Sequence, residues 1–438
     1  MIIYKLLIIV IILWIISIAV RKDLFSPESL LCISYILAIV CAIYNIDNWN
    51  INLHYNTYLV IVIGIFSFFL PSLFFYFFHK NKNAKNISKK LEWIEIKSGK
   101  LVFLNVISLI IMMIYSIYFI KALGGFGALL NFSNAMEIYR NKTMFQHLTL
   151  IPSWINFLSK ICRAVCFIYT YILINNLIID KNWMKSKRKI KNQFIIGIAS
   201  YIPLTIMSGG RYDLIVYIIY IIVIFSILFT IRNKKRLQTG KILKIGLIVM
   251  LVLIVFSSYR GLVGRTAESN TIDYITEYFG GSIAIFDIYM QEMHPKAAYF
   301  GQETFSGIRK LAYQFKIIDN QGLSEDAMLF RTTDNNKVIG NVYTGFRKPY
   351  HDFGIIGVIF LQVILALIFN KMYYNCFYKS EKNKISFRII TTGTLFYCIV
   401  LHSYSETFFC NVLSFNYLML FIIIYVIIHF LERIEVKI

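Results

Sequence analysis

A series of long apolar blocks constrains this chain more than any other feature of its sequence. The blocks recur along nearly all of its 438 residues. Most are about 17–25 residues long, which is the length of helix that crosses the hydrocarbon core of a bilayer. Buried strands are shorter, about 4–8 residues, and an open sheet edge is not tolerated in lipid. The sequence therefore predicts an all-α polytopic membrane protein.

The composition agrees with this interpretation. Only 16% of the residues are charged, against roughly 25% in soluble proteins. The net charge is +22, which in a soluble protein would suggest binding to nucleic acid. Here most of the positive residues lie in short loops between apolar blocks, as the positive-inside rule requires. We therefore expect membrane lipid around the chain and no nucleic-acid partner.

Eleven blocks qualify as predicted transmembrane helices. The first is expected to be a retained span, because it is too long for a typical signal-peptide core and lacks a clear cleavage site. The predicted spans are 2–20, 29–45, 57–78, 101–120, 153–179, 193–207, 213–231, 242–257, 353–374, 386–402 and 411–431.

The loops alternate in their content of Lys and Arg, and this alternation predicts the orientation. Residues 46–56 and 403–410 contain no Lys or Arg, whereas segments such as 80–100 and 181–191 are rich in them. The pattern places the N-terminus outside and the C-terminus in the cytoplasm. It divides the chain into eight spans, a large extracytoplasmic loop with interfacial helices, and three further spans. These three parts are 1–257, 258–352 and 353–438.

The seven cysteines all lie in or beside apolar blocks, and none forms a CxxC pair. The large outer loop contains none of them. We therefore expect neither a disulfide framework nor a zinc site. The sequence also has no DxD, HxH or HExxH pattern, so it gives no support for a divalent metal, and no cofactor is expected.

Arginines on the predicted outer face are candidates for binding phosphate, because the guanidinium is planar, permanently charged and able to bind in a bidentate manner. Arg211 lies in a tight Ser-Gly-Gly-Arg connection between two spans, and Arg260 and Arg265 follow directly on the eighth span. Glycines beside them let a ligand approach the backbone. The alternatives are pairing with a carboxylate, and snorkelling to lipid headgroups for Arg260 and Arg265.

Two ionisable residues stand where the chain returns into the membrane before the ninth span. His351 and Asp352 lie in Tyr350-His351-Asp352-Phe353-Gly354. A carboxylate or imidazole at this position could accept a proton from a hydroxyl group. It could equally cap the helix at the membrane surface, and the sequence leaves both roles open.

Several of these segments together resemble the Wzy-type polymerases of bacterial surface polysaccharides. The resemblance rests on the Ser-Gly-Gly-Arg segment at Arg211, on Arg260, on Gly124-Gly125 followed by Arg140, and on the stretch from Gly340 to Gly357. The matched stretches are short and scattered over residues 124–357. The arrangement of many spans with one large outer loop before the last three is the stronger part of the resemblance.

The resemblance implies a GT-C-like glycosyltransferase in the bacterial cytoplasmic (inner) membrane, with its active site on the extracytoplasmic face. Its substrate would be an oligosaccharide linked to undecaprenyl pyrophosphate, for O-antigen of lipopolysaccharide or for capsule, and a chain-length regulator would be a conceivable partner. The related O-antigen ligases carry a His before the final spans. Asn341 stands near that position here, and the His comes later, at His351.

From the resemblance and the residues together, we assign expected roles. Asp352 or His351 is expected to act as the base. Arg211, Arg260 and Arg265, with Arg140 and Arg347 as lesser candidates, are expected to bind pyrophosphate. Tyr343, Tyr350, Glu303 and Asn341 are expected to contact sugars. The competing hypotheses are an O-antigen ligase or another GT-C transferase, a flippase or transporter of lipid-linked glycan, and a non-enzymatic membrane scaffold.

Overall fold

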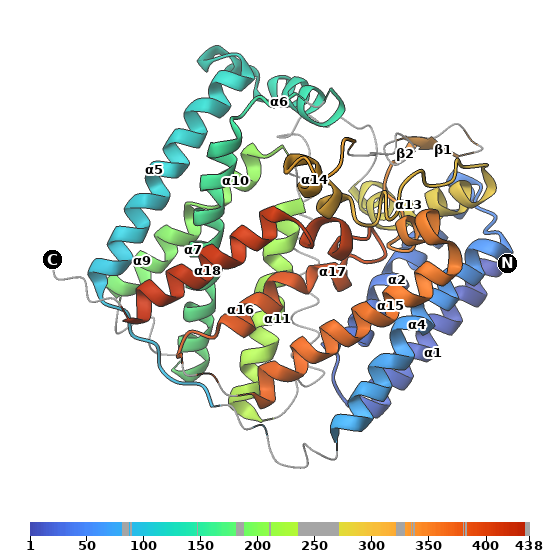
Figure 1. Ribbon diagram of the computed structural model, residues 1–438, viewed down its shortest axis with the longest axis horizontal. Coiled ribbons are helices and arrows are strands. Elements are labelled where there is room, and N and C mark those ends of the chain that lie inside the picture. The colour runs from blue at the N-terminus through green and yellow to red at the C-terminus, as the bar shows by residue number, and fades with distance from the viewer. Residues whose placement is uncertain are drawn as a thin grey trace. The chain divides into compact units, whose positions relative to one another are not determined.

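The structure, a computed structural model, is almost entirely helical (Figure 1). It describes residues 1–80, 87, 90–146, 148–180, 188–209, 212–234, 271–320, 329–333, 335, 338–379, 381 and 383–433. Within these ranges nine helical stretches are long and apolar enough to cross a membrane, and the only strands are β1 (Arg331–Thr332) and β2 (Val338–Gly340), which pair antiparallel. The chain is thus an all-α, multi-pass membrane protein, as the sequence predicts.

Nine of the eleven predicted spans correspond to these helical stretches. They are Ile2–Arg21, Pro27–Tyr44, Tyr55–His79, Ser98–Leu123, Ser153–Ile179, Arg188–Met207, Tyr212–Asn233, Arg347–Tyr378 and Phe415–Arg433. The predicted span 386–402 is a shorter apolar stretch that divides into α16 (Phe387–Leu395) and α17 (Tyr397–Val400). The predicted span 242–257 lies outside the described residues.

The helices group into two compact units. The first comprises Met1–Ile87, Ser269–Tyr378 and Leu395–Leu418. Its helices are α1 (Ile2–Arg21), α2 (Pro27–Tyr44), α3 (Ile46–Trp49), α4 (Tyr55–Lys80), α13 (Thr271–Gln291), α14 (Ser306–Gln314), α15 (Arg347–Tyr378), α17 and the π-helix η6 (Phe408–Val412).

In the first unit α1 and α15 both pack along α4, and α13 packs along α2 (Figure 1). The faces of these helices that point away from the protein carry large apolar side chains, such as Ile8, Phe74, Ile356 and Phe360, which are 57–75% exposed. An apolar surface of this extent is unfavourable in water and is what a lipid-facing surface requires.

The second unit comprises Ser88–Glu268, Lys379–Thr394 and Met419–Ile438. Its centre is α7, which contacts three other helices of the unit, α5, α9 and α11. Its described helices are α5 (Ser98–Leu123), η2 (Phe126–Asn131), α6 (Phe132–Arg140), η3 (Asn141–Phe145), α7 (Ser153–Ile179), α9 (Arg188–Ala199), α10 (Ile202–Met207) and α11 (Tyr212–Asn233), with most of α16 and of α18 (Phe415–Arg433).

One charge within a span has its partner inside the second unit. Arg163 lies in the middle of α7, where its Nη1 is 3.8 Å from Asp213 Oδ1 and its guanidinium lies over the ring of Phe167. A charge in a membrane-spanning helix is costly unless it is paired or faces other helices. The Asp213 carboxylate therefore accounts for the tolerance of Arg163 in an apolar block.

The helix that carries the predicted base is interrupted at Gly354. This residue has φ 65° and ψ −159° inside α15, while the rest of Arg347–Tyr378 is helical. Glycine adopts such a conformation without the steric penalty that a Cβ would add. The break separates a short polar segment, Arg347–Phe353, from the apolar part of α15, close to where the sequence predicts the ninth span to begin.

The segment predicted as the large outer loop, 258–352, contains the helix α13, which is tightly packed against α2. A Cβ added to Gly280 would lie 2.6 Å from the backbone nitrogen of Ala42 and 2.7 Å from the carbonyl carbon of Cys41. Small residues allow such close contact between helix backbones, a common way for membrane helices to associate.

Gly280→Ala is expected to push α13 away from α2, because the obstructing atoms are backbone atoms. We expect the free energy of unfolding in detergent to fall by about 1–3 kcal/mol, the usual cost of overpacking. Gly127→Ala is the matched control, since no atom lies within 4 Å of its added Cβ. An unchanged stability of Gly280→Ala would contradict the close packing of these two helices.

Candidate active site

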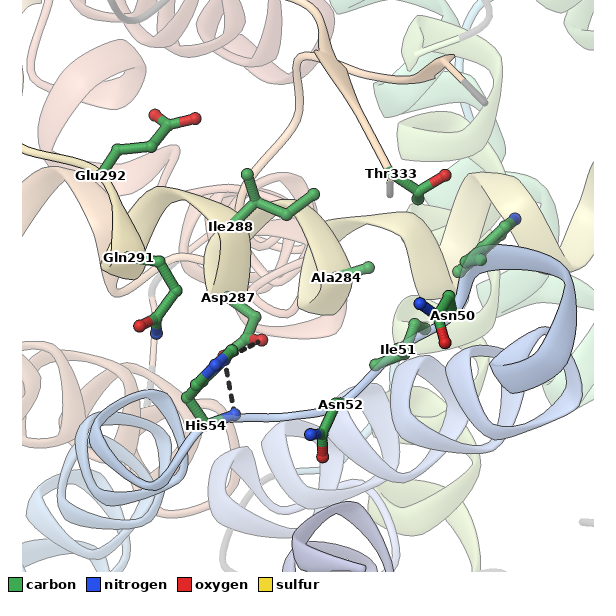
Figure 2. A pocket seen from close by; sticks show the side chains of 11 residues that line it. Asn50, Ile51, Asn52, His54, Ala284, Asp287, Ile288, Gln291, Glu292 and Thr333 are labelled. Carbon is green, nitrogen blue, oxygen red and sulfur yellow. Dashed lines mark hydrogen bonds and ion pairs between the residues drawn. The ribbon is translucent and has the colours of Figure 1, made fainter. Parts of the chain in front are cut away.

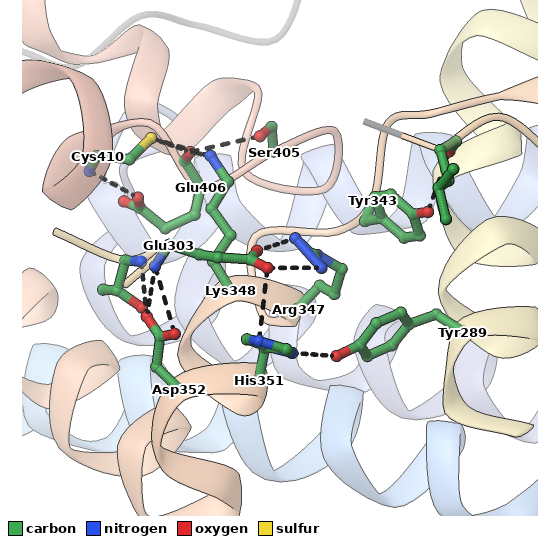
Figure 3. Close-up of polar contacts among 12 residues, drawn as sticks. Tyr289, Glu303, Tyr343, Arg347, Lys348, His351, Asp352, Ser405, Glu406 and Cys410 are labelled. Carbon is green, nitrogen blue, oxygen red and sulfur yellow. Dashed lines mark hydrogen bonds and ion pairs between the residues drawn. The ribbon is translucent and has the colours of Figure 1, made fainter. Parts of the chain in front are cut away.

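The centre of the candidate site is a buried ion pair between Arg347 and Glu303. Arg347 is the first residue of α15, and Glu303 lies just before α14. The Arg347 guanidinium donates to the Glu303 carboxylate (Figure 3), and the two residues are only 1% and 4% exposed. Because a lone buried charge is strongly unfavourable, each of these side chains needs the other.

Asp352 fixes the chain segment that carries Glu303. Its Oδ2 accepts hydrogen bonds from the backbone N–H groups of Glu303, at 3.1 Å, and Thr304, at 2.7 Å. The carboxylate thus joins the polar start of α15 to the loop before α14. In this arrangement Asp352 acts on the site through the backbone of Glu303.

His351 lies beside the ion pair and is connected to a second element. Its Nδ1 is 2.8 Å from the hydroxyl of Tyr289, near the end of α13, and its Nε2 is 3.6 Å from Glu303 Oε1 (Figure 3). These contacts orient the imidazole between a hydroxyl and a carboxylate. An oriented imidazole beside a carboxylate is a suitable proton acceptor.

A second buried arginine, Arg331 in β1, lies near the first. It is 5% exposed, its Nη1 donates to the Tyr343 hydroxyl at 2.6 Å, and it pairs with Glu292. Both guanidinium groups lie over the rings of Tyr289 and Tyr343, with distances to the ring centroids of 4.8–5.5 Å. Cation–π contacts of this kind hold arginines in place where water is excluded.

Tyr343 is therefore a buried support for the two arginines. Burial raises the pKa of its hydroxyl above the ordinary value, although the positive charges of Arg331 and Arg347 act in the opposite direction. The phenol is neutral at physiological pH. It can accept the hydrogen bond from Arg331 while it donates to the carbonyl of Leu329 at 3.4 Å.

A cavity of about 220 Å³ opens beside His351. We call it the His351 cavity. Its lining side chains combine aromatic, imidazole and charged groups, a mixture suited to a polar ligand. They are Tyr289, Met290, Glu292, His294, Pro295, Lys296, Tyr350 and His351.

A neighbouring cluster attaches the segment before α18 to α15. The Lys348 ammonium group lies 3.1 Å from Cys410 Sγ and 3.4 Å from the carbonyl oxygen of Glu406 (Figure 3). Burial raises the pKa of the Glu406 carboxyl, and burial raises the pKa of Cys410 to about 12. A thiol with this pKa is protonated at neutral pH, so Cys410 supports the packing and is a poor nucleophile.

The structure brings together six of the eleven candidate residues. Arg347, Glu303, His351, Asp352, Tyr343 and Tyr350 all belong to the region just described. Asn341 follows β2 and is partly exposed, and Arg140 is the last residue of α6 in the second unit. Arg211, Arg260 and Arg265 lie outside the described residues.

Several residues of the site are not among the sequence candidates, among them Arg331, Tyr289 and His294. No local sequence pattern distinguishes these three. The ring of Tyr289 stacks on that of His294 with centroids 3.7 Å apart. A hydrogen bond between residues 62 positions apart, as between Tyr289 and His351, leaves no local signal in a single sequence.

No protein-family model, curated protein or solved structure matches this chain. Among the residues that the structure describes, no group of three or more His, Cys, Asp and Glu side chains is placed to hold a metal ion.

The interdependence of Arg347 and Glu303 can be tested with a double-mutant cycle. Arg347→Met and Glu303→Leu are each expected to lower the free energy of unfolding by about 3–5 kcal/mol, because each leaves a buried charge unpaired. The double variant should lose much less than the sum. The measurement is chemical unfolding in detergent, and losses that add to within about 0.5 kcal/mol would contradict the pairing.

Proposed function

We propose that this chain is a glycosyltransferase that polymerises lipid-linked repeat units of a bacterial surface polysaccharide on the outer face of the cytoplasmic membrane. The observation that carries the proposal is the cluster at the polar start of α15. Two buried arginines, Arg331 of β1 and Arg347 of α15, lie there with an oriented imidazole and a cavity. Arg347 and the imidazole of His351 belong to the short segment that precedes the break at Gly354. The resemblance to Wzy-type polymerases supplies the class of substrate.

The proposed reaction moves the growing glycan from undecaprenyl pyrophosphate to a fresh lipid-linked repeat unit. A hydroxyl of the acceptor's non-reducing sugar attacks the anomeric carbon of the donor glycan. The new glycosidic bond forms as the bond from that carbon to the pyrophosphate oxygen breaks, and undecaprenyl pyrophosphate leaves with the bonding electron pair. The proton of the acceptor hydroxyl passes to the base.

His351 fits the role of this base better than Asp352 does. The imidazole lines the cavity, whereas Asp352 is not among the residues that line it, and its carboxylate holds two backbone N–H groups. A general base must reach the proton that it removes. In the proposal Asp352 is accordingly a positioning residue, which holds Glu303 and thereby Arg347.

Negative charge that develops on the departing pyrophosphate needs preorganised donors. Arg331 fits this role because of its partner. Glu292 lines the cavity, and the Glu292 side chain is 43% exposed. A phosphate group can therefore replace Glu292 as the counterion of Arg331. Arg347, with its fully buried partner, would stabilise the same charge from a fixed position, and Arg211, Arg260 and Arg265 remain part of the proposal.

Both substrates would be held in the bilayer by their lipid tails, so that their encounter takes place at the membrane surface. Confinement of this kind makes a bimolecular reaction effectively intramolecular. The proposal places the polar start of α15 on the extracytoplasmic side, following the positive-inside pattern of the loops. No cofactor takes part in the proposed step.

The test is a gel profile of surface glycan from a strain that lacks this chain, complemented with wild type, Arg347→Lys or Arg309→Lys. Lysine at position 347 keeps a charge opposite Glu303 but lacks the planar fork. We expect single repeat units in the deletion strain, a ladder with wild type, and a decrease of about 10²-fold in polymer with Arg347→Lys. The Arg309 guanidinium lies over the ring of Tyr299 and donates to the carbonyl oxygen of Asn320, contacts that a lysine can also make, so its variant should retain the ladder.

Other outcomes would replace the proposal. If the deletion strain accumulates lipid-linked units inside the cell and has no glycan at its surface, the chain is a flippase. Polymer that forms normally but stays on its lipid carrier would indicate a ligase. Chain levels in the membrane fraction must be equal among the complemented strains, so that a loss of polymer reflects activity.

A further inference from the structure

The first unit contains a second cavity, of about 210 Å³. We call it the His54 cavity. Its walls are the segment from Trp49 to His54, which leads from α3 into α4, and one face of α13, with Thr333 beside β1 (Figure 2). Glu292 lines this cavity and the His351 cavity, so the two are neighbours.

Trp49 provides a polar group that has no partner. The side chain is only 1% exposed, and its indole nitrogen is buried without a hydrogen-bond partner among the described residues. A buried donor left unsatisfied costs about 1–3 kcal/mol. Because Trp49 lines the cavity, an acceptor oxygen of a ligand there can supply the missing bond.

His54 is held in a fixed orientation at the same cavity. Asp287 Oδ1 accepts a hydrogen bond from the backbone N–H of His54 at 3.0 Å, and Asp287 Oδ2 lies 3.0 Å from His54 Nδ1 (Figure 2). The Asp287 side chain is buried, whereas that of His54 is 52% exposed. With Nδ1–H donating to the carboxylate, Nε2 is left to accept a hydrogen bond from a ligand.

The remaining polar groups are neutral or acidic. The amides of Asn50, Asn52 and Gln291 and the hydroxyl of Thr333 offer both donors and acceptors,. Asp287 and Glu292 are carboxylates, and none of the residues that line the cavity is Lys or Arg. This set suits a ligand rich in hydroxyl groups, which can donate to the carboxylates and exchange hydrogen bonds with the amides,.

The size of the cavity limits the ligand further. Pockets for drug-sized molecules measure roughly 300–1,000 Å³, so a cavity of about 210 Å³ holds a single ring and not an oligosaccharide. We propose that the His54 cavity binds one sugar residue of the glycan, with the Trp49 N–H, His54 and Gln291 as its contacts. The choice of a glycan as the source of this sugar rests on the proposed function.

The test measures binding directly, on the purified full-length chain in detergent, by isothermal titration calorimetry. The probe is the soluble repeat-unit oligosaccharide released from the surface glycan of the strain that encodes the chain. Trp49→Phe keeps an aromatic ring and removes the N–H donor together with the second ring of the indole, and His54→Ala removes the acceptor. Each should weaken binding about tenfold, a change of about 1.4 kcal/mol.

His79→Ala is the matched control, because His79 lies at the other end of α4 and stacks on Phe75. It should bind the probe as wild type does. Equal elution volumes and melting temperatures show that the variants are folded.

Failure of this inference is separate from failure of the proposed function. Either no binding by wild type or unchanged binding by both cavity variants would overturn the sugar site, whatever the gel profile shows. If the sugar binds here and the deletion strain still makes its ladder, the cavity stands as a carbohydrate site and the polymerase assignment falls.

Discussion

The buried ion pair of Arg347 and Glu303 is the interaction on which the polar cluster of the first unit depends. It joins the start of α15 to the loop before α14, and Asp352 fixes that loop from the following turn. Two charges in an apolar surrounding are stable only when they are paired and hydrogen-bonded. The pair therefore fixes the positions of His351 and the cavity beside it, at the junction between a polar segment and an apolar helix.

Hydropathy alone was sufficient to predict most of the fold, since in lipid the backbone must satisfy its own hydrogen bonds and long apolar runs become helices. The prediction was less accurate where a run is interrupted. The block 386–402 divides near Phe396, and the stretch Arg188–Met207 consists of two helices separated at Ser200 and Tyr201, just before Pro203. Proline removes a backbone donor, but the conformation around Phe396 has no comparable signature in the sequence.

The candidate site was only partly predictable. The residues around His351 were found because they are adjacent in the sequence and precede a predicted span. Tyr289 and Arg331 were missed because they reach the site through tertiary packing, from α13 and β1. Glu303 was expected to contact sugar, and the structure places it as the counterion of Arg347. The sequence shows which residues are charged, whereas the fold decides which of these charges are paired.

Catalysis by His351 is the central claim, and reconstitution tests it most directly. Purified wild type and His351→Gln would be placed in liposomes with lipid-linked repeat units, and glycan length and released polyprenyl pyrophosphate would be measured together. The account predicts that wild type lengthens the glycan and releases one lipid pyrophosphate for each bond formed, and that His351→Gln does neither at a comparable rate. Extension at the wild-type rate by His351→Gln, or none by wild type, would contradict it.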